Sequence, residues 1–241
     1  MNRRGDRLGQ AGQLRVVLAG RLEYALAREV MRGLVEYKRS HPEAPQWLIL
    51  CEHPPVITLG RRGSPADVLG RGKKIEVVEV ERGGLATYHG PGQVVAYPIV
   101  NLRAVGLGVR GLVGALMEAM AGVVRSLGLT PGRREGHPGV WVGGKKVGFV
   151  GLAVRGGVSF HGVSLNYGDC LEGFRLISPC GLDPREVGSL GEFVDTSLGW
   201  ADLAMALGRE LCRTLNLELV WSPLQELARA AGVQIRVGEG L

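Results

Sequence analysis

The sequence predicts a single α+β domain in which a largely antiparallel or mixed sheet is flanked by helices. Three observations lead to this prediction. Amphipathic helical segments occur in the first half, the middle and the last part of the chain, short β-rich segments with glycine and proline lie between them, and no linker or repeat interrupts the pattern. Hydrophobic residues make up 45% of 241 positions, enough for a buried core. We expect one domain over residues 1–241, with residues 1–13 as a disordered tail.

The first part of the chain is predicted to run strand, helix and then several strands. Residues 14–19 are an apolar run typical of a strand. Apolar residues then recur at helical spacing up to His41: Leu22, Leu26, Val30 and Leu34. Further β-rich segments lie at 47–51, 56–59, 74–81 and 94–100. The chain therefore begins to build a sheet after its first helix.

The second part is predicted to contain a helix, an antiparallel meander and two short helices. A second set of apolar residues at helical spacing ends near Gly128: Leu112, Leu116, Met120, Val123 and Leu127. β-rich segments follow at 140–142, 146–154 and 158–165. They are separated by the glycine pairs 143–144 and 156–157, which favour tight hairpins. The last part of the chain favours helices at 200–215 and 223–231.

Charge and composition narrow the possible partners and location. The net charge of +6 suits an acidic partner, but no motif or aromatic-basic platform accompanies it, so nucleic acid is not expected. No secretory apolar run follows the basic amino terminus, which predicts a cytoplasmic protein whose four cysteines are free thiols. The longest segment without charged residues, 83–102, is rich in glycine and proline. We interpret it as loop and strand, not a membrane-spanning helix.

Cys180 is the first residue that could carry covalent chemistry. It lies in Ser178-Pro179-Cys180-Gly181, between a residue of fixed φ and one that tolerates positive φ, and such a turn can expose a nucleophile. A reactive thiol also needs a nearby cation or helix amino terminus that favours the thiolate. The alternative is a buried structural cysteine, which is the interpretation we give to Cys51, Cys170 and Cys212.

The lysine pair Lys145-Lys146 is a second candidate. A lysine pair after a glycine turn is usually a solvated hairpin tip, yet the following Val147–Gly151 segment contains glycines that leave room for a ligand. In a strand the two lysine side chains point to opposite faces, so only one of them can enter a site. The spacing does not say which.

The glycine-rich segment 82–93 is a third candidate, either as a flexible loop or as a pocket lining. It matches neither a phosphate loop nor a dinucleotide loop. The spacing of His53, His89 and His161 fits no zinc pattern, so no metal is expected. We expect a structural role for His53 and exposed positions for His41 and His137.

Five motifs in this order, between Glu52 and Gly181, resemble those of the octanoyltransferases of lipoate biosynthesis: EHPPVITLGR, RGGLATYHGPGQVVAYP, KKVGFVG, HGVSLN and ISPCG. The resemblance implies the fold of the biotin and lipoate protein ligase catalytic domains. It also implies transfer of octanoyl from acyl carrier protein to a lysine on a lipoyl domain of a 2-oxoacid dehydrogenase or glycine-cleavage protein, with no ATP and no metal.

The resemblance assigns roles to particular residues. Cys180 would carry the acyl thioester and Lys146 would be the catalytic lysine. The implied substrate-binding residues come from three segments: Arg82, Gly83, Gly84, Leu85, Ala86, Thr87, Tyr88 and His89; Phe149, Val150 and Gly151; and His161, Gly162, Val163 and Ser164. Ile57 and Ser164 depart from the family's pattern, where an aromatic residue and alanine are common, which leaves chain-length preference open.

Three other functions compete with this one. An ATP-dependent lipoate or biotin ligase on a similar fold would need no nucleophilic cysteine, and its characteristic segments are absent from this sequence. A non-catalytic module that binds acyl groups or lipoyl domains would need neither Cys180 nor Lys146. A Cys-His hydrolase would release free octanoate.

Overall fold

The computed structural model describes residues 12–70, 75–179, 181–195 and 199–235. Eight strands in this part of the chain form one mixed sheet, in the order β11-β1-β2-β6-β10-β9-β8-β7. Their bounds are β1 Gln13–Arg21, β2 Gln46–Glu52, β6 Gln93–Ile99, β7 Gly132–Arg134, β8 His137–Val142, β9 Lys145–Arg155, β10 Val158–Asn166 and β11 Glu218–Trp221. β1 runs parallel to β2 and β11, and the pairs from β2 to β7 are antiparallel.

A smaller sheet of described strands lies beside the main one, in the order β4-β3-β5. β3 is Val56–Leu59, β4 is Glu76–Glu79 and β5 is Ala86–His89. β3 pairs in parallel with β4 and antiparallel with β5. The small sheet packs with Phe149 of β9 and with the short helix α3 (Leu171–Phe174), so a separate apolar cluster forms around it.

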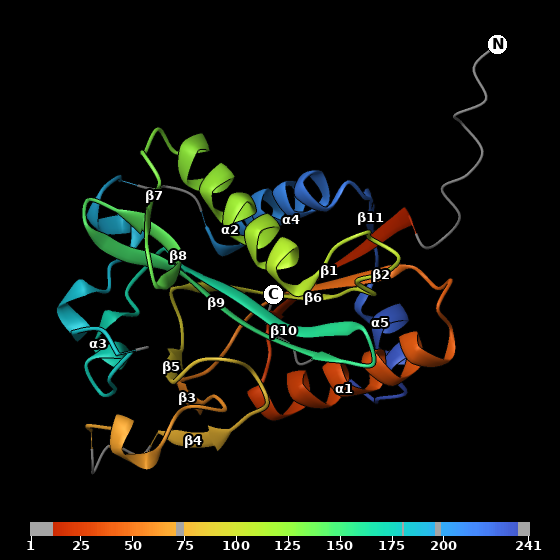
Figure 1. Cartoon of the computed structure of the whole chain (residues 1–241), viewed down its shortest axis with the longest axis horizontal. Helices are drawn as coiled ribbons and strands as arrows, with labels where there is room; N and C mark the ends of the chain where they lie inside the picture. The colour runs from red at the N-terminus through yellow and green to blue at the C-terminus, as the bar shows by residue number, and fades with distance from the viewer. Residues whose placement is uncertain (1–11, 71–74, 180, 196–198, 236–241) are drawn as a thin grey trace.

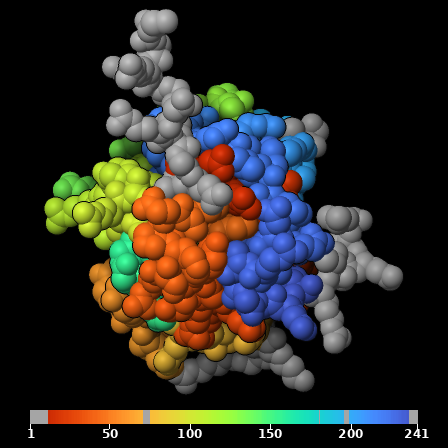
Figure 2. Space-filling view, turned by 90° about the vertical axis from the view of Figure 1, so that its right-hand side faces the viewer, coloured from red at the N-terminus to blue at the C-terminus, as the bar shows by residue number. Residues whose placement is uncertain are grey.

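Helices cover both faces of the main sheet (Figure 1). α2 (Val109–Ser126) and α4 (Trp200–Leu215) bury their apolar faces on one side, whereas α1 (Tyr24–Ser40) and α5 (Leu224–Ala231) do so on the other. Figure 2 shows residues of the α1 region in orange lying directly against the C-terminal residues in blue. Short 3-10 helices lie in connecting segments of the described chain, at Pro65–Asp67, Pro184–Glu186 and Leu190–Glu192.

The predicted fold class is confirmed, and most predicted elements occur within a few residues of their expected bounds. β1 starts at Gln13, the last residue of the predicted tail, and residues 1–11 lie outside the described part of the chain. Residues 86–89 form the strand β5, whereas the sequence predicts a flexible loop or a pocket lining for the segment 82–93. Of the predicted strand at 74–81, residues 76–79 form β4. Three short elements, α3, β7 and β11, had no prediction.

Candidate active site

Lys145 and Lys146 point in opposite directions at the start of β9. The β8–β9 hairpin turns at Gly143 and Gly144, whose φ angles are 54° and 81°. The Lys145 side chain is 40% exposed and its Nζ lies 2.5 Å from Glu192 Oε1. Lys146 is only 2% exposed. The prediction that one lysine turns inward is confirmed, and Lys146 is that lysine.

Aromatic rings and glycines surround the Lys146 side chain. Its Nζ lies 4.8 Å from the ring centroid of Phe149 and 5.9 Å from that of Trp141. These distances are typical of cation–π contacts. A Cβ at Gly139 would lie 2.6 Å from Lys146 Cε, so a larger residue at that position would displace the lysine.

Lys146 lines a cavity that we call the Lys146 cavity. Gly83, Gly84 and Leu85 contribute to its wall, together with Val150 and Gly151 of β9. The remaining lining residues are Arg62, Val109, Val113, Gly136, His137, Pro138 and Leu152. The N–H of Gly83 donates to the Leu152 carbonyl at 2.9 Å, which fixes the 82–85 segment against β9. Segments about 60 residues apart in sequence therefore meet around one lysine.

Cys180 lies outside the described residues, but Pro179 and Gly181 on either side of it are described. Pro179 forms a parallel bridge with Ala86, and the N–H of Leu182 donates to the Pro179 carbonyl at 3.0 Å. Gly181 has a φ of 73°, which agrees with the prediction that a residue tolerant of positive φ follows Cys180. A Cβ at Gly181 would lie 3.7 Å from Leu85 Cδ1. The residues on either side of Cys180 thus lie next to the 85–86 segment, which borders the Lys146 cavity.

A second cavity, the inner cavity, adjoins the first through Val150 and Gly151, which line both. Its wall combines residues of β5, β6, β9 and β10 with Tyr24 of α1. The lining residues are Tyr24, Arg82, Thr87, His89, Val95, Tyr97, Phe149, Val150, Gly151, His161, Gly162, Val163 and Ser164. All members of the predicted segments at 149–151 and 161–164 lie here.

Alternation along β5 divides the predicted residues of the 82–89 segment. Thr87 and His89 face the inner cavity, whereas Ala86 and Tyr88 lie outside both cavities and pack in the cluster around Phe174. Tyr24, Val95 and Tyr97 line the cavity without having been predicted. Periodicity identifies them as buried positions, but it does not show which buried face borders a cavity.

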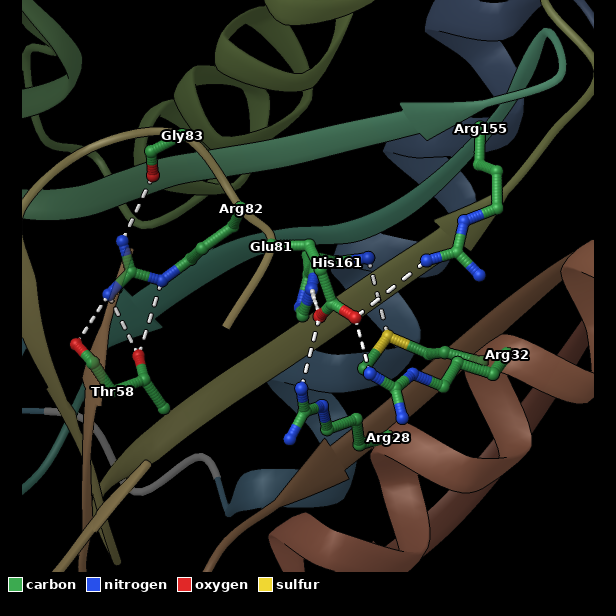
Figure 3. Close-up of polar contacts among 9 residues, drawn as sticks. Arg28, Arg32, Thr58, Glu81, Arg82, Gly83, Arg155 and His161 are labelled. Atoms are coloured by element: carbon green, nitrogen blue, oxygen red, sulfur yellow. Dashed lines mark hydrogen bonds and ion pairs between the residues drawn. The ribbon is translucent and has the colours of Figure 1, made fainter. Parts of the chain in front are cut away.

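Arg82 ties the small sheet to the wall of the inner cavity (Figure 3). It is 6% exposed, and its Nη2 donates to the carbonyl and the hydroxyl of Thr58 at 2.7 and 2.8 Å. Its Nη1 donates to the Gly83 carbonyl at 3.0 Å. A Cβ at Gly151 would lie 2.9 Å from Arg82 Cδ. Arg82 therefore positions the glycine segment and β9 relative to each other.

His161 lies between the inner cavity and a cluster of charged residues (Figure 3). It adopts a φ of 57° within β10, and its backbone N–H donates to Met31 Sδ at 3.3 Å. A non-glycine residue in this conformation is uncommon, and such residues often occur at functional sites. Burial lowers the pKa of His161 to about 4, so the ring is neutral at pH 7.

Glu81 organises that charged cluster. Its carboxylate pairs with Arg32, lies 3.4 Å from Arg28 and 3.8 Å from Arg155, and is 3.7 Å from His161 Nε2. Burial alone would raise the pKa of Glu81, but the hydrogen bond from Arg32 and the nearby positive charges lower it to about 2. Glu81 is therefore ionised and places a negative charge beside the His161 ring.

His53 has the structural role that we predicted. It is fully buried, with Nδ1 2.5 Å from the Leu22 carbonyl and Nε2 2.8 Å from the Tyr97 hydroxyl. His41 is exposed as expected, whereas His137 is half-buried at the rim of the Lys146 cavity. The described residues contain no group of three or more His, Cys, Asp and Glu side chains that could hold a metal ion.

The three cysteines in the described part of the chain are buried thiols, as interpreted from the sequence. Cys51, Cys170 and Cys212 are free and at most 5% exposed. Burial raises the pKa of Cys170 and of Cys212 to about 12 and that of Cys51 even further above its ordinary value. These three thiols are poor nucleophiles at neutral pH. In the described part of the chain, no helix combines the length and the apolar character needed to cross a bilayer.

Known proteins match most of this chain. The family described as "Lipoyl protein ligase A/B catalytic domain" matches residues 23–212. A probable octanoyltransferase of Pyrobaculum arsenaticum is 43% identical over 73% of this chain and 81% of its own length. The octanoyltransferase of Alkaliphilus metalliredigens is also 43% identical, over 75% of this chain and 85% of its own length. The chain belongs to the octanoyltransferase family.

The fold of this octanoyltransferase family member extends to more distant proteins. A crystal structure of lipoate-protein ligase A bound with ATP aligns with a TM-score of 0.70 at 18% sequence identity, covering 90% of this chain and 93% of that one. At this identity the comparison shows the shared fold alone. The fold expected from the sequence motifs is thereby confirmed.

Proposed function

We propose that this octanoyltransferase family member takes an octanoyl group from acyl carrier protein, holds it as a thioester on Cys180 and delivers it to a lysine of a lipoyl domain. Octanoyl transfer in lipoate biosynthesis follows from the family and from the names of its relatives. One observation carries the assignment to residues. The buried Lys146 shares its cavity with Leu85, next to which Gly181 and the bridge between Ala86 and Pro179 lie.

In the first step, the Cys180 sulfur attacks the carbonyl carbon of the donor thioester. A new bond forms between that carbon and Sγ, the bond to the pantetheine sulfur breaks, and the pantetheine thiol leaves with one proton. Exchange of one thioester for another is nearly isoenergetic, so we propose that neither ATP nor a metal is needed.

Lys146 has two chemically reasonable roles in this step. As an ammonium, it stabilises the attacking thiolate by its charge, and each pKa unit by which the thiol is lowered corresponds to about 1.4 kcal/mol. As an amine, it takes the proton from the incoming nucleophile. Both roles require the lysine to be held inside the protein, which its burial supports.

In the second step, the acceptor lysine attacks the acyl group on Cys180. The amide bond forms, the bond between carbon and Sγ breaks, and the proton lost by the amine returns to the thiol. Backbone N–H groups of the 83–85 segment or of Gly181 are candidates to stabilise the oxyanion of each tetrahedral intermediate. The free enzyme is then restored.

The inner cavity is the proposed site of the acyl chain. It adjoins the Lys146 cavity at Val150 and Gly151, which line both, and Val95, Phe149 and Val163 contribute apolar lining. Gly162 lets β6 and β10 approach closely, because a Cβ there would overlap the Ala96 carbonyl. The predicted substrate-binding segments 149–151 and 161–164 thus line this cavity together with Thr87 and His89.

The donor and the acceptor are proteins in this proposal. The net charge of +6 favours encounter with acidic carrier and lipoyl domains. Free thiols suit a reducing compartment, and we propose that the reaction takes place in the cytoplasm.

Intact-protein mass spectrometry tests the covalent step. The protein is incubated with octanoyl carrier protein, without ATP and with a metal chelator, and we expect an octanoyl adduct that disappears in Cys180→Ala. The matched control is Cys170→Ala, which removes a buried thiol and should retain the adduct. An adduct that persists in Cys180→Ala would overturn the assignment of the nucleophile.

Addition of a lipoyl domain separates the competing functions. Transfer to the lipoyl lysine without ATP supports the octanoyltransferase, whereas a requirement for ATP supports a ligase. Release of free octanoate that is faster than transfer supports a hydrolase. Octanoyl binding that survives Cys180→Ala, with no turnover in the parent protein, supports a non-catalytic binding module.

A further inference from the structure

The mouth of the Lys146 cavity carries an arginine that the proposed mechanism does not use. Arg62 lines this cavity and is exposed, so it lies where the cavity opens to solvent. Lys146 lines the same cavity and is only 2% exposed, so it marks the inner end. The cavity has a volume of about 250 Å³, far more than the about 10–15 Å³ that one water needs. It therefore has room for part of a substrate between a buried and an exposed cation.

The positive charge of Arg62 is not compensated by the protein. Within the described chain its side chain forms no ion pair or hydrogen bond, whereas Lys145 pairs with Glu192 and Arg134 pairs with Glu186. Among the described residues that line the cavity there is no aspartate or glutamate. The mouth of the cavity therefore favours an anion.

The backbone of Arg62 is held against the glycine-rich segment. Its N–H donates to the Gly84 carbonyl at 3.1 Å, and the N–H of Gly60 donates to the Leu85 carbonyl at 3.1 Å. A Cβ at Gly60 would lie 2.6 Å from the Gly84 carbonyl oxygen, so the two segments are in close contact. Gly84 and Leu85 line the cavity themselves. The Arg62 side chain therefore starts from a fixed point on the cavity wall.

The donor of the proposed function has a matching distribution of charge. In a phosphopantetheine arm the thioester is at one end, a phosphodiester is at the other, and the part between them is uncharged. Val109, which is 50% exposed, Val113 and Leu152 provide apolar lining for that uncharged part. With the thioester beside Lys146, an arm that leaves through the mouth brings its phosphate to the surface there.

We propose that Arg62 binds the phosphate of the phosphopantetheine arm at the mouth of the Lys146 cavity and so favours donors that carry this phosphate. An arginine suits this role because its planar guanidinium can donate two parallel hydrogen bonds to one phosphate. The inference rests on the proposed function, since it places the donor thioester beside Lys146. Arg62 is then a binding residue, whose effect belongs in KM for the donor.

Two small donors that differ only in the phosphate test the inference: octanoyl-phosphopantetheine and octanoyl-pantetheine. Transfer to a lipoyl domain is followed by mass spectrometry, and kcat and KM are measured for each donor. We expect wild type to have a KM about tenfold lower for the phosphorylated donor. Arg62→Gln should remove most of this preference and should also raise KM for octanoyl carrier protein about tenfold.

The matched control is Arg61→Gln. Arg61 is also exposed and its substitution removes the same charge, but Arg61 does not line the cavity. This variant should keep the wild-type preference between the two small donors. An equal loss of preference in Arg61→Gln would assign the effect to net charge and overturn the inference.

Two further results would also overturn it. One is a preference for the phosphorylated donor that persists in Arg62→Gln. The other is an effect of Arg62→Gln on octanoyl carrier protein alone, which would mean that Arg62 meets acidic residues of the carrier instead of the phosphate. If wild type transfers octanoyl from none of the three donors, the proposed function fails instead.

Binding without turnover covers the case in which the small donors react too slowly. Calorimetry on Cys180→Ala compares the two intact donors, and we expect the phosphorylated one to bind about tenfold more tightly. The difference should be lost when Arg62→Gln is added. Equal binding of the two donors to Cys180→Ala contradicts the inference.

Discussion

At the scale of the residue, two lysine side chains with the same chemistry differ in how deeply they are buried. Lys145 and Lys146 are adjacent, yet one forms a partly exposed ion pair with Glu192 and the other is enclosed by aromatic rings. The pleat of β9 accounts for this difference, because consecutive side chains in a strand point to opposite faces. The same strand therefore supplies a surface charge and a candidate catalytic amine.

This contrast gives a matched pair of variants. Lys146→Met keeps most of the buried volume but removes the amine, and we expect transfer to fall by about a hundredfold or more. Lys145→Met should keep transfer within about twofold of wild type, since exposed ion pairs contribute little. Single-turnover transfer rates, with thermal unfolding to confirm the fold, measure both. A Lys146→Met protein that transfers at a rate close to wild type would remove this lysine from the mechanism.

At the scale of the element, the small sheet and the loop before β5 determine the positions of the predicted substrate-binding residues in the 82–89 segment. β5 is paired with β3, whose sequence is about 30 residues earlier, and Gly83 is bonded to β9. Arg82 connects these parts through Thr58 and Gly83. The glycine-rich segment is therefore a fixed wall of both cavities.

Helix packing on the far side of the sheet depends on a close approach between α1 and α5. A Cβ at Gly33 would overlap the carbonyl oxygen of Ala231, and Figure 2 shows the two regions side by side. Gly33→Ala should lower the free energy of unfolding by about 1–3 kcal/mol, because one helix must move. Urea unfolding measures this change.

The α2 helix offers the matched control. Gly114 has no atom within 4 Å of the position that a Cβ would take, and it is exposed. Gly114→Ala should raise the free energy of unfolding by about 0.5–1 kcal/mol, since alanine loses less backbone entropy on folding. Equal effects of the two substitutions would show that the approach of α5 does not constrain α1.

At the scale of the whole molecule, several buried histidines make stability sensitive to acid. Burial lowers the pKa of His53 and of His161 to about 4 and that of His89 to about 3, from an ordinary value of 6.5. Between pH 6.5 and about 4 the unfolded chain therefore binds more protons than the folded chain. The free energy of unfolding of the protein should therefore fall as the pH is lowered through this range.

Unfolding in urea at a series of pH values tests this prediction. The slope should reach about 1.4 kcal/mol per pH unit for each histidine that stays neutral in the folded state. His53→Gln should reduce the slope by about one such contribution. A His53→Gln protein with the wild-type slope would show that this imidazole is not acid-sensitive.

Net charge should affect how the whole molecule meets its protein substrates. With a charge of +6, attraction to an acidic carrier is screened by salt. Raising the salt concentration from about 0.05 to 0.5 M should raise KM for the carrier several-fold and leave kcat nearly unchanged. An uncharged octanoyl thioester of a small thiol is the control donor. If its KM rises equally, charge steering is not the cause.

Much of this fold is predictable from local pattern. Helices α1, α2 and α4 and the β8–β9–β10 meander follow from periodicity and from glycine pairs at the turns, because these signals act over a few residues. β5 is missed because glycines surround it and because β3, its partner, is distant in sequence. β11 is similarly short and joins the sheet by pairing with β1 at the other end of the chain.

The sequence by itself determined the α+β class, the order of motifs and, through them, the family and the pairing of Cys180 with Lys146 as candidates. Only the tertiary structure decided that Lys146 is buried, that Thr87 and His89 line a cavity while Ala86 and Tyr88 do not, and that Tyr24 and Tyr97 join them. The physical reason is the range of the interactions. Periodicity records which face of an element is apolar, but a cavity forms where distant elements pack, and burial and pairing there depend on all of them.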